Sequence, residues 1–462
     1  MIKEYDTIAA IATSVSNAGI GKIRVSGSDA IRILDEIFEP YTPRYGNGYW
    51  PSHKVYFGNV VDEGEIIDEC IVLVMKAPNS YTREDVVEFD CHGGVHVVYQ
   101  VLSLILRHGA RAAEPGEFTK RGFLNGRIDL SQAEAVMQLI ESKNEASRQN
   151  SIRQIKGNIA EKIRPVREQI LYEIAHIESA LDDPEHISLD GYGDHLLTLV
   201  QDWIDQVEKM LSTYDDGRFI TEGIRTCIVG KPNAGKSSFL NVLLGEERAI
   251  VTEVAGTTRD TLEESVTIDG ITLNIIDTAG IRDTEDTVEK IGVERARKEI
   301  EHADLVLFLI DMADGIQEED IHIFKEIKDK KKIILLNKMD IGETFSMESL
   351  KDYVEDDTPC ITISAKYRQG IDLFTKELKK MMFHGTIDEK QDFYLTNARH
   401  KNALEETLGS LRMVRGSIID QMPEDFFTID LMNAYEMLGS ILGEAVGEDL
   451  IEEIFSKFCT GK

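Results

Sequence analysis

Eight consecutive residues near the middle of the chain have the types and spacing of a phosphate-binding loop. Gly230–Ser237 fits the pattern G-x-x-x-x-G-K-[ST] and lies between the apolar runs Thr226–Val229 and Phe239–Leu244. In such a strand–loop–helix setting the backbone N–H groups surround the phosphates, Lys236 reaches the β- and γ-phosphate oxygens, and the Ser237 hydroxyl binds Mg²⁺. Because both flanks fit, the loop predicts a nucleoside triphosphate site.

Three further motifs follow in the order expected of a guanine-nucleotide-binding protein. Asp277–Gly280 ends an apolar run, where the aspartate supports Mg²⁺ and the glycine N–H meets the γ-phosphate. Asn337–Asp340 ends another run, and Asp340 can accept hydrogen bonds from two N–H groups of guanine, which favours GTP over ATP. Ser364–Lys366 supplies the loop behind the base. Together the motifs predict a GTPase.

The catalytic residues differ from those of Ras-like enzymes. Thr258, within Gly256–Asp260, is the candidate second Mg²⁺ ligand of a switch loop, although a solvated turn has the same composition. Ras-like enzymes place a water-orienting Gln after the Asp-x-x-Gly motif, where this chain has Ile281, and no arginine finger is evident in the chain. Such a finger contributes roughly 10³–10⁵ in rate. Another group must therefore position the water and neutralise the developing charge.

The composition is that of a soluble globular protein. The 462 residues correspond to about three domains, and 42% of them are hydrophobic and 29% charged. No apolar segment is long enough for a signal peptide or a bilayer span, which predicts a cytoplasmic protein. The five scattered cysteines include no C-x-x-C pair, which argues against a disulfide framework or a structural zinc site.

Charge is unevenly distributed along the chain. The net charge of −32 argues against a general polyanion binder, since a phosphate backbone requires a positive surface. Residues 144–167 include six Lys or Arg and two Glu, whereas residues 421–454 include nine acids and no base. Each run can equally be an ordinary solvated surface. Contact with RNA must therefore be local or supported by a basic partner.

Periodicity divides the chain into four segments. Residues 1–120 are mixed α and β, residues 121–218 are helical, residues 219–385 alternate strands and helices, and residues 386–462 are helical again. We therefore predict an α/β + α fold with an N-terminal α+β domain and a helical domain, into which a P-loop GTPase domain with a mostly parallel sheet is inserted. The expected strands of the inserted domain are Thr226–Val229, Leu273–Ile276, Leu305–Ile310 and Ile333–Leu336, and the helical stripe before it is Val166, Ile170, Ile174, Ile177 and Leu181.

Motifs outside the GTPase segment point to one family. They are Pro115–Arg121 with Leu124–Leu130, and the tail Phe458–Lys462. Together with Gly230–Ser237, Gly256–Asp260 and the run 277–292, they resemble the MnmE (TrmE) family of tRNA modification GTPases over essentially the whole chain. Other small GTPases do not carry the motifs outside the GTPase segment.

The resemblance implies how the missing catalytic groups are replaced. In this family a potassium ion takes the place of an arginine finger, and a Glu beyond the Asp-x-x-Gly motif orients the water; here that residue is Glu289. The implied metal ligands are Asn233, Thr252, Val254 and Thr257 for K⁺, and Ser237 and Thr258 for Mg²⁺. The expected GTP-binding residues are Asn233, Ala234, Gly235, Lys236, Ser237, Ser238, Thr252, Glu253, Val254, Ala255, Gly256, Thr257, Thr258, Asp277, Thr278, Ala279, Gly280, Asn337, Lys338, Asp340, Ser364, Ala365 and Lys366.

The resemblance also implies that residues 1–120 bind a folate, 5-formyl-tetrahydrofolate or a related compound, and dimerise. The matching positions are Arg24, Glu88, Arg127 and Lys462. Arg and Lys suit the carboxylates of folate, and Glu suits its aminopyrimidine N–H edge, although each is also a common surface charge. The segment 13–18 lacks the Pro/Gly-rich sequence usual in the family, so the resemblance does not specify the shape of the rim of the folate pocket.

The C-terminal tail carries a candidate catalytic thiol. Cys459 is the fourth residue from the end, and Thr460 stands where the family usually has Ile. A thiol on a flexible tail can reach a bound folate, but a frayed and inert cysteine is an equal alternative.

The expected function is that of a homodimeric, potassium-activated GTPase. With a flavin- and NADH-dependent partner protein, it would install an aminomethyl or carboxymethylaminomethyl group on the wobble uridine of certain tRNAs, using a tetrahydrofolate one-carbon unit. One alternative is a GTPase switch for ribosome assembly, which shares the nucleotide motifs but does not explain the N-terminal domain or the cysteine tail. Another is a folate-dependent one-carbon transferase with an accessory GTPase.

Overall fold

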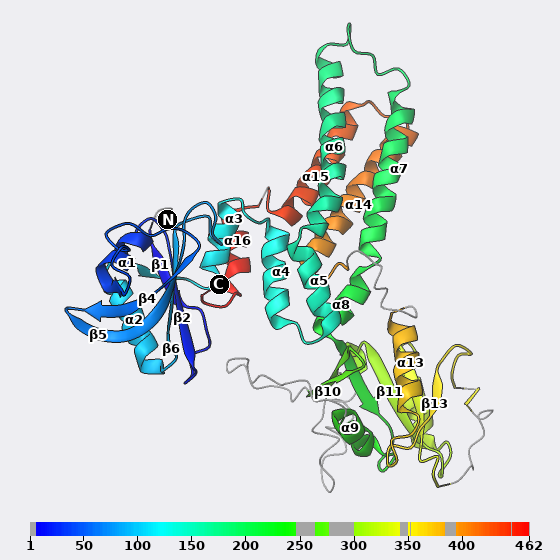
Figure 1. Cartoon of the computed structure of the whole chain (residues 1–462). Coiled ribbons are helices and arrows are strands. Elements are labelled where there is room, and N and C mark those ends of the chain that lie inside the picture. The colour runs from blue at the N-terminus through cyan, green and yellow to red at the C-terminus, as the bar shows by residue number, and fades with distance from the viewer. Residues whose placement is uncertain are drawn as a thin grey trace. The chain divides into compact units, whose positions relative to one another are not determined.

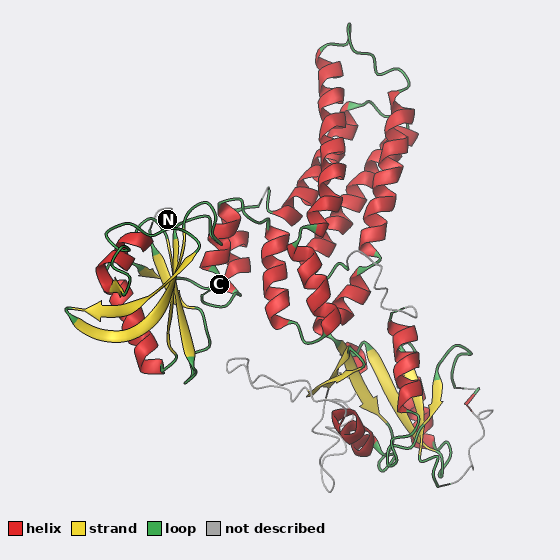
Figure 2. Cartoon of the chain, in the orientation of Figure 1, coloured by secondary structure: helices red, strands yellow, loops and turns green. Residues whose placement is uncertain are grey.

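The computed structural model describes residues 6–245, 264–276, 300–341, 350–351, 353–383, 394–444 and 446–461. The chain divides into two compact units, one of residues 1–137, 154–190 and 416–462 and the other of residues 138–153 and 191–415. Figure 1 labels helices and strands of both units. Mixed sheets and many helices alternate along the chain (Figure 2), which confirms the predicted fold class. Among the described helices, none combines the length and apolar character needed to cross a bilayer.

A seven-stranded sheet dominates the first unit, with strand order β3-β4-β5-β6-β2-β1-β7. The strands are β1 (Ile8–Ile11), β2 (Ile20–Ser26), β3 (Phe38–Pro40), β4 (Lys54–Asp62), β5 (Glu65–Met75), β6 (Val86–His92) and β7 (Arg111–Ala112). All neighbouring strands are antiparallel except β1 and β7. Alternate residues such as Val72 and Phe89 face one side of the sheet and form a core with helices α1 (Ala30–Ile37) and α2 (Val95–Arg107).

Helices from both ends of the chain complete this unit. They are α3 (Glu117–Leu124), the first part of α4 (Leu130–Glu141), α6 (Asn158–Asp182), α15 (Asp425–Leu442) and α16 (Glu448–Ser456). Helix α6 packs along α15, where the Arg167 guanidinium lies 4.0 Å from the centroid of the Tyr435 ring. The predicted stripe of α6 is buried as far as Ile177, but Leu181 is 44% exposed because the helix ends one residue later.

The second unit contains a six-stranded sheet, with strand order β13-β12-β11-β8-β10-β9. The strands are β8 (Ile224–Val229), β9 (Glu264–Ile268), β10 (Ile271–Ile276), β11 (Leu305–Asp311), β12 (Lys332–Asn337) and β13 (Cys360–Thr362). All are parallel except β9, which lies antiparallel at one edge. The four expected strands are therefore present, each one or two residues longer than predicted.

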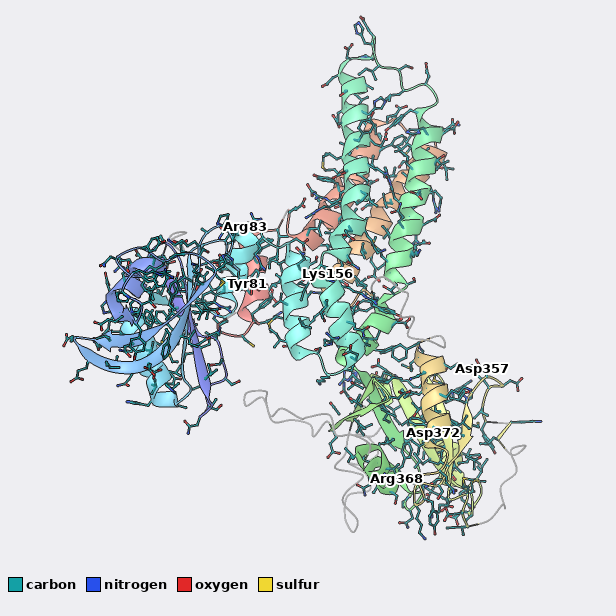
Figure 3. The ribbon with its side chains drawn as sticks, viewed as in Figure 1. Tyr81, Arg83, Lys156, Asp357, Arg368 and Asp372 are labelled. Carbon is teal, nitrogen blue, oxygen red and sulfur yellow. The ribbon has the colours of Figure 1, made fainter. Side chains whose placement is uncertain are left out.

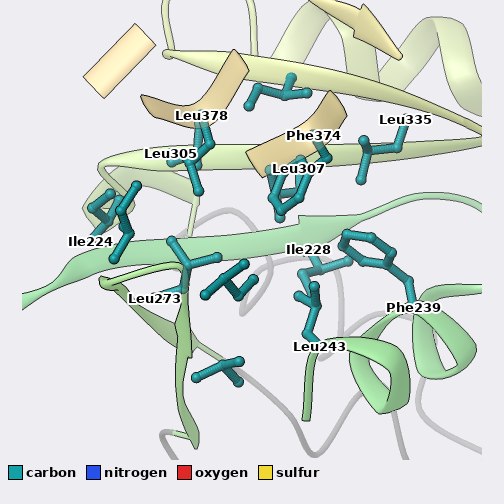
Figure 4. Close-up of a cluster of buried hydrophobic side chains, with 14 of the residues drawn as sticks. Ile224, Ile228, Phe239, Leu243, Leu273, Leu305, Leu307, Leu335, Phe374 and Leu378 are labelled. Atoms are coloured by element: carbon teal, nitrogen blue, oxygen red, sulfur yellow. The ribbon is translucent and has the colours of Figure 1, made fainter. Parts of the chain in front are cut away.

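Helices cover the strands of this sheet and bury its apolar side chains. They are α9 (Lys236–Gly245), α12 (Glu318–Glu326) and α13 (Ile371–Met382). Figure 4 shows Phe239 and Leu243 of α9, and Phe374 and Leu378 of α13, converging on the central strands. A closed core of this kind holds the carboxyl ends of the parallel strands together, which is where such sheets bind ligands.

The remaining helices of the second unit flank the sheet in sequence. They are most of α5 (Glu145–Ile155), α7 (Tyr192–Leu211), α8 (Tyr214–Glu222) and most of α14 (Ala398–Ile419). Helix α14 is joined to α7 by an ion pair of 2.7 Å between Arg412 and Glu208. Asn150 of α5 donates its side-chain amide to the Tyr394 carbonyl at 3.2 Å and accepts from the Tyr394 N–H at 3.0 Å. Chain segments before and after the sheet are therefore in contact, and the insertion of the GTPase domain stays a prediction.

Candidate functional site

The phosphate-binding loop joins the end of β8 to the start of α9. Gly230 and Gly235 have φ angles of +150° and +100°, which favour glycine. A Cβ atom on Gly230 would lie 2.5 Å from the Leu309 carbonyl oxygen, and one on Gly235 would lie 2.1 Å from Nδ2 of Asn337. Both glycines are therefore required by close approach as well as by conformation. The loop ends at the N-terminus of α9, where the first-turn N–H groups and the helix dipole favour a phosphate.

The Lys236 side chain lies over the phosphate-binding loop, as the motif predicts. Its Nζ donates to the carbonyl oxygens of Gly230 and Lys231 at 2.7 and 2.9 Å. Burial lowers the pKa of the Lys236 ammonium, because the charged form is poorly solvated there. A phosphate at the loop would oppose this effect by favouring the charge. Asn233 is exposed on this loop, and Ser237 and Ser238 are exposed in the first turn of α9.

Asn337 joins the phosphate loop to the loop behind the base. It is the last residue of β12, and its side chain is 2% exposed. Its Nδ2 donates to the Ala234 carbonyl at 2.8 Å, and its Oδ1 accepts from the Ala365 N–H at 3.0 Å. The Asn337 side chain thus braces two predicted nucleotide-binding segments.

The neighbouring residues place the predicted guanine contacts at the same edge of the sheet. The Ser364 hydroxyl donates to the Asp340 carboxylate at 2.6 Å, which orients the acceptor predicted to pair with guanine. Lys338 adopts a left-handed backbone conformation (φ +69°) and forms a 2.5 Å ion pair with Asp311, at the end of β11. Lys366 is exposed, with its Nζ 5.1 Å from the centroid of the Tyr367 ring.

A second cluster of predicted residues lies on the sheet of the first unit. Arg24 on β2 and Glu88 on β6 are direct cross-strand partners, with 2.8 Å between Arg24 Nε and Glu88 Oε1. The Lys22 ammonium lies 2.6 Å from the other Glu88 oxygen. Burial alone would raise the pKa of Glu88, but the bonds to Lys22 and Arg24 outweigh it and hold this pKa below its usual value. Glu88 is therefore ionised and able to accept further hydrogen bonds.

Tyr81 connects the predicted arginines. Its ring centroid lies 5.8 Å from the Arg24 guanidinium carbon and 4.6 Å from that of Arg127. Arg127 Nη1 also donates to the Tyr81 carbonyl at 3.4 Å. An open pocket of about 520 Å³ beside this ring is lined by Met75, the loop 78–81, Arg83 and Arg127. Figure 3 marks Tyr81 and Arg83 on the loop between β5 and β6.

The C-terminal tail lies against the same sheet. Arg24 Nη1 donates to the Gly461 carbonyl at 3.2 Å, and the Gly116 N–H donates to the Cys459 carbonyl at 3.3 Å. Gly461 has a φ angle of +96°, and a Cβ there would lie 2.4 Å from the Ile11 carbonyl oxygen. The Cys459 thiol is free and exposed. The tail thus brings the predicted catalytic thiol to the domain that carries Arg24.

Comparison with known proteins decides the family. Residues 7–127 match the family described as GTP-binding protein TrmE N-terminus, and residues 130–459 match the MnmE helical domain. The tRNA modification GTPase MnmE of Lachnoclostridium phytofermentans is 52% identical over 457 residues, which cover 99% of either chain. The MnmE of Clostridioides difficile is 44% identical over 461 residues, with the same coverage. The chain belongs to the MnmE family.

Membership of the MnmE family makes this chain a GTP-hydrolysing enzyme, as its motifs predict. Among solved structures, Era in complex with MgGDPNP and nucleotides 1506–1542 of 16S ribosomal RNA is 29% identical, with a TM-score of 0.27. That similarity covers 40% of this chain and 66% of Era.

Several predicted residues of this MnmE-family chain lie outside the described part. These are Thr252, Glu253, Val254, Ala255, Gly256, Thr257, Thr258, Asp277, Thr278, Ala279, Gly280, Glu289 and Lys462. Within the described ranges, no group of three or more His, Cys, Asp or Glu residues could hold a metal ion. Of the predicted metal ligands, only Asn233 and Ser237 are described, so both metal sites stay predictions.

Sequence reasoning on this MnmE-family chain missed three contributors. Tyr81 and Arg83 belong to a loop whose residues have no periodicity or motif of their own. Asp311 lies one residue beyond the expected strand Leu305–Ile310, and its ion pair with Lys338 depends on which strands are neighbours. No local signal in the sequence would have identified these residues.

Proposed function

We propose that this MnmE-family GTPase modifies the wobble uridine of certain tRNAs, together with a flavin- and NADH-dependent partner protein. An aminomethyl or carboxymethylaminomethyl group is added to the base, using a one-carbon unit from tetrahydrofolate. The grouping of Arg24, Tyr81, Arg127 and the cysteine tail in the N-terminal domain carries this proposal. A protein that acts only as a GTPase switch does not need a folate site or a catalytic thiol. The relatives' name, tRNA modification GTPase, supports tRNA as the substrate and hence the cytoplasm as the place of action.

The residues around Tyr81 fit a folate chemically. The ionised carboxylate of Glu88 retains lone pairs for the N–H edge of an aminopyrimidine, since each carboxylate oxygen accepts more than one bond. Tyr81 offers an aromatic surface, and Arg24 and Arg127 offer charge-assisted donors. Bound folate would supply the one-carbon unit, while Cys459 on the adjoining tail is the proposed catalytic thiol. Lys462 would add a further cation.

Removal of either arginine should weaken folate binding. Hydrogen bonds to charged groups contribute roughly 1.5–3 kcal/mol each, so Arg24→Ala and Arg127→Ala should each raise the Kd for 5-formyl-tetrahydrofolate about 10- to 150-fold. Calorimetry on the full chain measures the effect, with Arg44→Ala as a matched control because Arg44 is exposed outside the pocket.

Circular dichroism of each variant separates lost binding from misfolding of the N-terminal sheet. The folate assignment fails if the wild type binds no folate, or if both well-folded variants bind as tightly as the wild type.

GTP hydrolysis is proposed to need two metal ions. Mg²⁺ would be held by Ser237 and Thr258, and K⁺ by Asn233, Thr252, Val254 and Thr257. The support within the described residues is Asn233, whose amide is exposed on the phosphate loop. A cation there would stabilise charge that develops between the phosphates. Glu289 is the proposed water-orienting residue.

The outer face of the N-terminal sheet supports a homodimer. Val55, Leu73, Glu88 and Arg24 follow one another across strands β4, β5, β6 and β2, so they share a face. On this face the side chain of Val55 is 62% exposed, and the neighbouring Phe57 and Ile71 are 49% and 42% exposed. Clustered apolar side chains of this kind mark interaction surfaces. We propose that two copies of the chain associate through this face.

The run of basic residues offers few free cations for RNA. Arg148 pairs with Glu145 at 2.6 Å, Arg164 lies 3.9 Å from Asp129, and Arg167 pairs with Glu444. These partners neutralise part of the positive charge seen in the sequence. The partner protein is therefore proposed to supply most of the contacts to the tRNA backbone.

A further inference from the structure

The pocket beside Tyr81 contains two guanidinium groups and no acidic lining residue. Arg83 and Arg127 both line it, together with Met75 and the loop 78–81. Its volume of about 520 Å³ is in the range of small-molecule sites. Arg127 belongs to the set proposed above to bind folate, whereas Arg83 has no role so far.

Arg83 combines an unusual backbone conformation with a hydrogen bond that fixes its side chain. Its φ angle is +62°, in the left-handed region that costs an L-residue other than glycine about 1–2 kcal/mol. Its Nη1 donates to the Asn125 carbonyl at 3.1 Å, and a Cβ added to Gly126 would lie 3.9 Å from the same nitrogen. The guanidinium of Arg83 is thereby fixed beside the turn that leads into Arg127.

Neither arginine is neutralised by the described part of the chain. Within those residues Arg83 and Arg127 form no ion pair, whereas Arg24, Arg111 and Arg121 of the same domain each pair with a carboxylate. This is notable in a chain with a net charge of −32. Two guanidinium groups that line one pocket repel each other unless an anion lies between or beside them. The pocket is therefore suited to a ligand with several negative charges.

We infer that Arg83 and Arg127 bind the carboxylates of a polyglutamyl tail, so that the site prefers folates with several γ-linked glutamates. This inference rests on the proposed folate site. Contacts run from Glu88 through Arg24 to Tyr81 and from Tyr81 to Arg127. Along this series Glu88 would receive the aminopyrimidine edge, Tyr81 the aromatic middle, and Arg83 and Arg127 the tail. Each added glutamate contributes one more carboxylate, and the open side of the pocket leaves room for the tail to extend.

Calorimetry with 5-formyl-tetrahydrofolate carrying one or three glutamates tests the inference on the full chain. The wild type should bind the triglutamate about tenfold or more tightly than the monoglutamate, because one further charge-assisted bond is formed. The ratio of the two affinities, triglutamate to monoglutamate, should fall towards one in Arg83→Gln. It should fall equally in Arg83→Gly, a variant that also relieves the strained backbone. Arg44→Gln, an exposed arginine outside the pocket lining, should keep the ratio of the wild type.

The outcomes separate the two levels of the proposal. Equal affinities of the wild type for both folates, or an unchanged ratio in both Arg83 variants, would overturn the tail subsite while leaving the folate site intact. A wild type that binds neither compound would overturn the folate site itself and the tail subsite with it. Thermal unfolding of each variant confirms that the domain is folded. Added salt should reduce the ratio in the wild type, because the proposed contacts are ionic and exposed.

Discussion

Asn233 connects the geometry of the phosphate loop to its proposed chemistry. It has a φ angle of +63° and an exposed side chain, and Asn tolerates this left-handed conformation better than most residues. The conformation leaves its amide oxygen accessible at the edge of the loop. No arginine finger is evident in the sequence, so an ion held at this position would have to supply the missing positive charge.

We therefore expect GTP turnover to depend on potassium. A positive charge at this place can contribute roughly 10³–10⁵ in rate, so turnover in KCl should exceed turnover in NaCl of equal ionic strength by about tenfold or more. Asn233→Gly preserves the left-handed backbone and removes only the ligand, so it should abolish the difference between the salts. Asn241→Ala, an exposed asparagine on α9, serves as control. Equal wild-type rates in both salts would contradict the potassium site.

At the scale of elements, the second unit places its motifs through the order of its strands. The loop after β8, the end of β11 and the end of β12 meet because these strands are parallel neighbours in the sheet. Asn337 then joins two of these segments through both ends of its amide. The positions of Ala234 and Ala365 therefore depend on a residue that the motif suggested only as a nucleotide contact.

Asn337→Ala should disturb the nucleotide site without touching a phosphate. Loss of its buried hydrogen bonds leaves an N–H and a carbonyl unpaired, which costs about 1–3 kcal/mol for each group. We expect a lower midpoint of thermal unfolding for the second unit and a higher Kd for a fluorescent GTP analogue, with Asn241→Ala unchanged. Normal affinity and an unchanged unfolding midpoint would show that the brace is dispensable.

The sequence predicted what local patterns determine. The glycines of the phosphate loop, the strands β8, β10, β11 and β12 of the second unit, and the burial of Ile170 and Ile174 all follow from spacing and residue type. The strands β9 and β13 were not predicted. The contacts of Arg24 with Tyr81 and Gly461 could not be predicted, because they join segments far apart in the chain and depend on how the tail packs. The left-handed backbone conformation of Arg83 could not be predicted either, because arginine has no preference for that conformation.

At the scale of the whole molecule, the two faces of the N-terminal sheet differ in what they contact. One face is filled by the core with α1 and α2, while the other carries the charged cluster of Lys22, Arg24 and Glu88 beside exposed apolar residues. The Tyr41 and Phe57 rings on this second face are 5.1 Å apart. A second copy of the chain that covers this face would remove the apolar surface from water and lie next to the folate residues.

A charge on this face should disrupt the proposed homodimer. We expect the wild type to have twice the chain mass of 52.0 kDa by light scattering, and Phe57→Glu to have the mass of one chain. Burying an unpaired carboxylate in an apolar interface is strongly unfavourable. Tyr99→Glu, on α2 and equally exposed, is the matched control and should stay dimeric. A monomeric wild type, or a dimeric Phe57→Glu, would contradict the proposed interface.

Mass spectrometry of tRNA nucleosides tests the central claim, that this GTPase acts on the wobble uridine, most directly. In a strain that lacks the protein, the modified wobble uridines should disappear, and the wild-type gene should restore them. Lys236→Ala and Arg24→Ala, which remove the proposed phosphate and folate contacts, should restore them poorly despite normal protein levels. Wobble uridines that remain fully modified in the deletion strain would contradict the account.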